Sequence, residues 1–281
     1  MNVHQQTLHF KLYKTVGTTR LWQIKGESNR SPFFYEAGII IDYDGAPDAY
    51  APRGSGLVGK DNLGNAVAIT DKSGQSPWLV PPAKQTDPPT NPRWTPTYAS
   101  TVRDHLTGAS VRQTSGRYAG YYISESSLKD VWHAVRGPTQ TDPAYQTDAN
   151  VFPYVVLPGN LLKDSYVKVG DYALAINGQT GRYTFALYGD AKKKPVMGES
   201  SSALATALLG RSAPAARGII YLVFPDSGIS FDYHADLGQL PSSGMRWLRR
   251  YNDRLNLAAQ ITSCFSPEFP GVAQAFRTMG L

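Results

Sequence analysis

Cysteine is almost absent from this chain of 281 residues, which contains only Cys264. An intramolecular disulfide is therefore excluded, and so is a zinc site of the CxxC type. We expect Cys264 to act as a small apolar residue near the end of a helix, because a free cysteine usually packs as a small hydrophobe. Packing alone must then hold the fold together.

Long apolar runs are also absent. No stretch of about 18 apolar residues occurs, so we expect no membrane span. Residues 1–20 lack the basic and then apolar pattern of a secretory signal. The chain is therefore expected either to work in the cytoplasm or to be made there and exported, by a route that needs no such signal, to an extracellular, cell-wall or periplasmic target.

Sequence motifs for cofactors and metals are missing as well. The five histidines form no HExxH pair, and no GxSxG elbow, Walker motif or dinucleotide glycine pattern occurs. His234 stands near Asp232 and Asp236, an arrangement that we interpret as a polar loop. We therefore expect no cofactor and no metal.

The charge of the chain is not balanced, since its formal net charge is +6 and its pI is about 9.2. A basic surface favours an anionic partner such as a cell-wall polymer, although it also serves solubility. The basic residues are scattered, apart from Lys192 to Lys194 and the arginines near the C-terminus. No nucleic-acid motif accompanies them, so a nucleic-acid partner is not expected.

Glycine, proline and tyrosine are abundant (26, 20 and 17 residues), and the apolar pattern along the chain is typical of strands. Alternation over residues 8–25 predicts two strands around a turn at Val16 to Thr18. Further strands are expected at 37–43, 120–124, 152–157 and 218–225. Residues 168–177 and 182–189 predict a hairpin that turns at Asn177-Gly178.

Two regions depart from the strand pattern. Residues 51–117 are expected to be irregular, and 76–97 contain seven prolines, with Trp78 and Trp94 among them. We interpret this region as a surface excursion of one domain rather than a linker. Residues 200–209 predict a short helix that ends at Gly210, and 242–261 predict an amphipathic helix that begins at Ser242 or Ser243.

Glycoside hydrolysis needs two carboxyl groups, one to protonate the leaving oxygen and one to activate water. Among 22 acidic residues, the strongest context belongs to Asp190 and Glu199. Asp190 ends a predicted strand, and Glu199 is expected to open the following helix. Gly189 and Gly198 precede them and would leave room for a substrate. Both acids also have an ordinary structural interpretation, as a turn residue and as a partner of the helix dipole.

Several stretches of the sequence resemble glycoside hydrolase family 75, and they follow the family's order. They are FFYEAGIIIDYDGAPDAY (33–50), GYYISESSLKD (120–130), the segment 145–157, VGDYALAING (169–178), YTFALYGDAKKKPVMGESSSALATALLG (183–210) and the strand 218–225. The resemblance spans roughly residues 33–228. The chain departs from the family pattern between Pro52 and Gly120, where it carries a longer proline-rich insertion.

The resemblance implies a mainly β fold, a six-stranded double-psi-type barrel with a helix after the catalytic turn and a C-terminal helical extension. It implies an inverting endo-glycoside hydrolase of the chitosanase type, with Asp190 and Glu199 as the essential acids. We assign Glu199 as the base, because a helix N-terminus favours a charged carboxylate, and Asp190 as the acid. Asp42, Asp44, Tyr121, Tyr122 and Lys194 are expected to contact the substrate.

These features predict a catalytic domain over residues 1–241, with an insertion at about 52–117, and a helical extension over 242–281. The expected partner is an amino-sugar polysaccharide, either chitosan or peptidoglycan. Chitosan is a polycation, whereas three lysines lie between the two acids, so a cell-wall hydrolase delivered as a toxin is one alternative. The other alternative is a carbohydrate-binding module on the same scaffold that has no turnover.

Overall fold

The computed structural model describes residues 10–52, 54–63, 67–71, 94–98, 100–104, 109–129, 141–159, 161, 166–192, 195–228 and 237–281. The chain divides into two compact units. The first comprises Met1–Asp42 and Ala149–Leu281, and the second comprises Tyr43–Asp148. Most of the predicted proline-rich stretch and the cluster around His234 lie outside the described residues.

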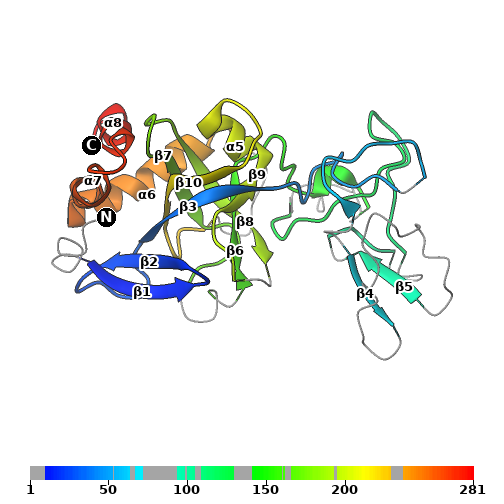
Figure 1. Cartoon of the computed structure of the whole chain (residues 1–281), viewed down its shortest axis with the longest axis horizontal. Coiled ribbons are helices and arrows are strands. Elements are labelled where there is room, and N and C mark those ends of the chain that lie inside the picture. Colours follow the sequence, from blue (N-terminus) through cyan, green and yellow to red (C-terminus); the bar gives the residue numbers. More distant parts are fainter. Residues whose placement is uncertain are drawn as a thin grey trace. The chain divides into compact units, whose positions relative to one another are not determined.

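The first unit is built on one sheet of eight strands, in the order β1-β2-β3-β10-β7-β8-β6-β9 (Figure 1). An additional pairing between β3 and β9 closes six of them into a barrel, so the mainly β fold with a six-stranded barrel is confirmed. The strands are β1 (Phe10–Val16), β2 (Thr19–Ile24), β3 (Phe33–Asp42), β6 (Tyr154–Pro158), β7 (Tyr172–Asn177), β8 (Tyr183–Lys192), β9 (Glu199–Ser201) and β10 (Ala215–Val223).

Both predicted hairpins are confirmed. β1 and β2 pair antiparallel across the turn that contains Gly17. β7 and β8 also pair antiparallel, and their turn is held by Asn177, whose side-chain oxygen accepts from the backbone N–H groups of Gln179 and Thr180 at 3.0 and 3.1 Å. An asparagine side chain that bonds ahead along its own backbone is the reason why this residue favours turns.

The core of the barrel consists of side chains from alternate positions of its strands. On β3, Phe33, Tyr35, Ala37 and Ile39 point into this core, as the two-residue period of a strand requires. The rings of Tyr35 and Tyr221 stack at 4.9 Å, and burial raises the pKa of both hydroxyls far above the ordinary value. These two tyrosines are packing residues.

Four α-helices occur in the described part of the chain, and all lie in the first unit. α5 (Ser202–Leu209) begins at the N-cap Ser201 and ends at Gly210, which adopts φ 76°, as predicted for a glycine C-cap. The predicted helix 242–261 is wrong as one element. The structure has α6 (Leu240–Leu255) and α7 (Leu257–Phe265), separated at Asn256 with φ 49°, and then α8 (Gly271–Thr278). None of the described helices is long and apolar enough to cross a bilayer.

The second unit has little regular structure in its described residues. β4 (Val67–Asp71) and β5 (Trp94–Tyr98) form an antiparallel pair, and Pro143–Tyr145 form one turn of 3₁₀ helix. The strand predicted at 120–124 is absent, because this segment forms only isolated bridges, from Tyr122 to Arg112 and from Ser124 to Thr101.

Candidate active site

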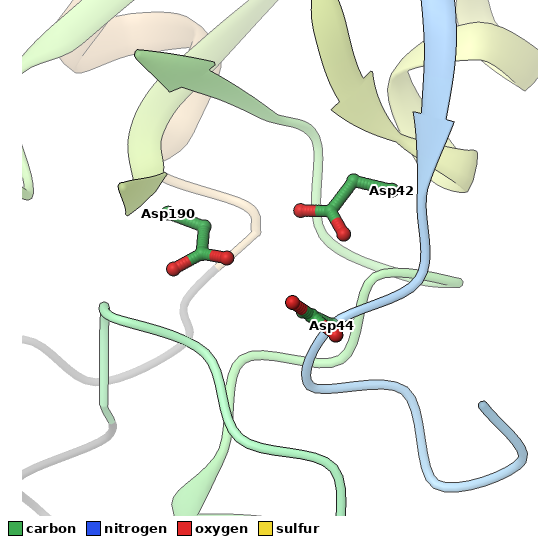
Figure 2. Close-up of side chains that lie close together, drawn as sticks. All are labelled: Asp42, Asp44 and Asp190. Carbon is green, nitrogen blue, oxygen red and sulfur yellow. The ribbon is translucent and has the colours of Figure 1, made fainter. Parts of the chain in front are cut away.

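The structure brings Asp190 together with Asp42. Asp190 lies on β8, next to Val156 of β6, and Asp42 is the last residue of β3. Asp44 follows two residues later, at the start of the second unit. A carboxylate oxygen of Asp42 lies within 4.8 Å of one of Asp190, and Figure 2 shows the two side chains pointing toward each other. Asp42 and Asp190 both belong to the barrel unit, so the inferences below depend on this pair.

Asp42 is held by a buried tyrosine. Its side chain is only 7% exposed, and the hydroxyl of Tyr154 on β6 donates to its Oδ2 at 3.1 Å. Tyr154 is itself fully buried, and its backbone N–H donates to the hydroxyl of Ser201 at 3.0 Å. A buried carboxylate is tolerated where hydrogen bonds compensate for lost hydration, so this contact fixes the position of Asp42.

Gly189 makes room for this tyrosine. It lies at a β-bulge, where Val155 pairs with Tyr188 and Val156 pairs with Asp190. A Cβ atom on Gly189 would come within 2.5 Å of the Tyr154 side chain. The glycine before Asp190 therefore accommodates a protein ring, and not a substrate as the sequence suggested.

Gly198 has a packing role of the same kind. Its φ is 91°, and a Cβ atom there would lie 2.7 Å from the carbonyl oxygen of Gly38. The N–H of Ile40 donates to the carbonyl of Gly198 at 2.9 Å. Gly198 thus allows β9 to pair closely with β3 and to complete the barrel.

Glu199 does not open a helix, which corrects the prediction. It is the first residue of β9 and pairs with Ile40 of β3, and α5 begins three residues later, after its cap Ser201. The macrodipole acts over the first turn of a helix, so it no longer supports Glu199 as the base. Glu199 is half-buried, and it is not part of the aspartate group within 4.8 Å.

Of the remaining predicted site residues, two belong to the second unit and one is not described. Tyr121 and Tyr122 belong to the second unit. Tyr121 donates to the carbonyl of Val58 at 2.9 Å, while Tyr122 is 4% exposed and lies under the guanidinium of Arg112. Lys194 lies outside the described residues.

Chemically, the aspartate group could hold a proton or a hard cation. Carboxylate oxygens are the ligands that Ca²⁺ and Mg²⁺ prefer, and Asp42 and Asp190 at this spacing could act together as ligands. Without a cation, adjacent negative charges disfavour each other, so carboxyl groups this close tend to share a proton. Sequence analysis predicts roles for both Asp42 and Asp190 but not that they meet.

A comparison of the chain with protein-family models and with curated proteins finds no match.

Proposed function

We propose that the chain is a glycoside hydrolase that cleaves an amino-sugar polymer, with Asp190 as general acid and Glu199 as general base. The observation that carries the proposal is the meeting of Asp190 with Asp42. A general acid must hold a proton at the working pH, and a second buried carboxylate beside it favours that state.

Asp42 and Asp190 are too close to each other to be an inverting pair. Their oxygens lie within 4.8 Å, whereas inversion requires carboxyl groups about 6.5–9.5 Å apart with a water between them. Asp42 is therefore better suited to holding the proton on Asp190 than to activating water.

Glu199 is offset from Asp42 along the sheet. In the β3–β9 register, Asp42 lies opposite Ser201 and Glu199 lies opposite Ile40. Two residues of strand correspond to roughly 6.6 Å, so Glu199 stands apart from Asp42. The acid–base pair is Asp190 with Glu199, and β6 lies between their strands, since it pairs with β8 at Asp190 and with β9 next to Glu199. Two strand spacings of about 4.8 Å each leave room for a water between the two carboxyl groups, which supports Glu199 as the base of an inverting endo-hydrolase.

The barrel supports the proposal at the level of the scaffold. Two of its pairings are parallel, β3 with β9 and β6 with β8, and the others are antiparallel. A mixed pairing of this kind is compatible with the double-psi type of barrel, which we propose for this chain together with the resemblance to glycoside hydrolase family 75.

The test is turnover by purified variants on chitosan and on peptidoglycan, supplied separately. Asp190→Asn and Glu199→Gln should each lower the rate about 10²–10⁴-fold, the usual contribution of a general acid or base, while circular dichroism and the melting temperature stay close to those of the parent. Asp253→Asn, at an exposed position of α6, is the matched control and should keep full activity.

Analysis of the products completes the test. The anomer released first, followed by NMR, should be inverted relative to the substrate. Near-normal rates in both variants would rule out the proposed residues. Tight binding of the parent protein to either polymer with no release of reducing ends would favour the alternative of a carbohydrate-binding module.

A further inference from the structure

The outer face of β3 carries Asp42 at its end and, two residues earlier, Ile40, which lines a groove. Strand alternation puts Glu36, Gly38, Ile40 and Asp42 opposite to the core residues Tyr35, Ala37 and Ile39. Glu199 pairs with Ile40, so its side chain lies on this outer face, since neighbouring residues in register share a face. Ile40 is 44% exposed.

The groove itself lies beside Ile40. It has a volume of about 560 Å³ and is formed by β2, β3, the start of β10 and one residue of α7. Its lining residues include Trp22, the apolar residues Ile40 and Met197, and two arginines, Arg20 and Arg217. An apolar surface with a few convergent polar groups is the usual make-up of a ligand site.

The two arginines differ in their partners. Arg217 forms ion pairs with Glu36 and Glu268, so its charge is compensated within the fold. Arg20 is exposed, and no carboxylate among the described residues pairs with it. Glu36 already has partners within the fold, because besides Arg217 it accepts a hydrogen bond from the N–H of Gly218 at 2.6 Å. Arg20 is therefore the cation that the groove offers to a ligand.

We propose that this groove binds an acidic sugar unit of the polymer, with Arg20 pairing with its carboxylate and Trp22 packing against its ring. A guanidinium matches a carboxylate in geometry as well as in charge, and the indole offers a broad apolar surface. The proposal rests on the proposed function, and it assigns the substrate class: an amino-sugar polymer that carries carboxylates, such as a peptidoglycan glycan strand, rather than chitosan.

The test is binding by the full chain, measured by calorimetry with Asp190→Asn as the background so that no turnover occurs. The probes are three oligosaccharides of equal length: a muramic-acid-containing peptidoglycan fragment (anionic), a chitin fragment (neutral) and a chitosan fragment (cationic). Arg20→Ala should weaken binding of the anionic fragment about threefold to tenfold and leave the neutral one within twofold. Arg249→Ala, which removes an exposed arginine from α6, should change neither.

This binding measurement and the turnover assay together separate the two proposals. If the anionic fragment binds no more tightly than the neutral one, or if Arg20→Ala binds it as well as the parent, the subsite is wrong even where the chain cleaves a polymer. If Arg20→Ala shows the expected loss but Asp190→Asn and Glu199→Gln hydrolyse normally, the subsite stands and the catalytic residues are wrong. Adding Trp22→Phe to the Asp190→Asn background should weaken binding of the neutral and the anionic fragment alike, because it reduces the apolar surface that both fragments contact.

Discussion

At the scale of single residues, the most informative contact is the one between Tyr154 and Asp42. Tyr154 can reach Asp42 at 3.1 Å only because Gly189 leaves space for its ring. Gly189 therefore helps to determine the position of Asp42, the carboxylate beside Asp190. Protein packing thus explains the glycine beside Asp190. The sequence alone does not show whether such a glycine makes room for a protein side chain or for a substrate.

A second buried carboxylate, Asp171, makes stability depend on pH. Its side chain is fully buried at the start of the β7 hairpin, and Oδ2 accepts from the N–H of Lys168 at 2.8 Å. Burial is the largest influence and raises the pKa of Asp171 from 3.8 to about 6. The folded protein therefore binds this proton more tightly than the unfolded chain does.

The sign of the effect follows from this order of pKa values. Between about pH 4 and pH 6 the folded state holds a proton that the unfolded state releases, so the free energy of unfolding falls as the pH rises through this window. The full cost, about 3 kcal/mol for a shift of this size, is present above it. We expect Asp171→Asn to flatten this part of the profile in urea unfolding at pH 4.5, 5.5, 6.5 and 7.5.

The control for this experiment is Asp253→Asn, which changes an exposed carboxylate. Its profile should run parallel to that of the parent protein. A profile of Asp171→Asn that also runs parallel would mean that Asp171 does not contribute to the pH dependence.

At the scale of elements, the break between α6 and α7 depends on one residue. Asn256 adopts φ 49°, and its N–H donates to the carbonyl of Asn252 at 2.7 Å while its own carbonyl accepts from Gln260 at 3.1 Å. Left-handed backbone costs most residues roughly 1–2 kcal/mol, and asparagine and glycine tolerate it.

We therefore expect Asn256→Ala to lower the free energy of unfolding by about 1 kcal/mol and the melting temperature by roughly 2–4 °C. Asn256→Gly is the matched variant, because it removes the same side chain but permits the same backbone, and it should melt close to the parent. Equal melting of the two variants would show that the asparagine side chain, and not its backbone conformation, sustains the break.

Local elements could be predicted from the sequence because their determinants lie within a few residues. The β7–β8 turn is fixed by the side chain of Asn177, and α5 by Ser201 and Gly210. The sequence pattern predicts the start of α5 too early, at residue 200, and therefore assigns Glu199 to the helix start. Ser200 and Ser201 are both compatible with a helix start, and the pairing of β9 with the distant β3 selects Ser201.

The meeting of Asp42 and Asp190 could not be predicted in the same way. The two residues are far apart in the sequence, and their strands are not neighbours in the sheet. They come together through the closure of the barrel, in which β3 pairs with β9, β9 with β6, and β6 with β8. Parallel pairings leave no local turn signal, since they are joined by long connections.

At the scale of the whole molecule, the net charge of +6 predicts that peptidoglycan, which carries carboxylates, is hydrolysed faster than the polycation chitosan. Lys192, Lys193 and Lys194 follow Asp190 in the sequence. Their side chains lie outside the described residues, so their effect is predicted from charge alone. Lysines near a cationic glucosamine unit repel it, and near a carboxylate-bearing unit they attract it.

We expect replacement of these three lysines by serine to raise the rate on highly deacetylated chitosan relative to the rate on peptidoglycan. Single exposed pairs contribute only about 0–1 kcal/mol, but three charges together should shift the ratio of rates several-fold at low salt. The shift should shrink at physiological ionic strength, where the screening length is about 8 Å.

The matched control replaces Arg246, Arg249 and Arg250 of α6, three exposed residues, and changes the net charge by the same amount. If the control shifts the ratio as strongly as the lysine variant, the preference comes from the charge of the whole molecule. If the lysine variant loses activity on chitosan and leaves the ratio unmoved or lower, the lysines do not repel the cationic polymer.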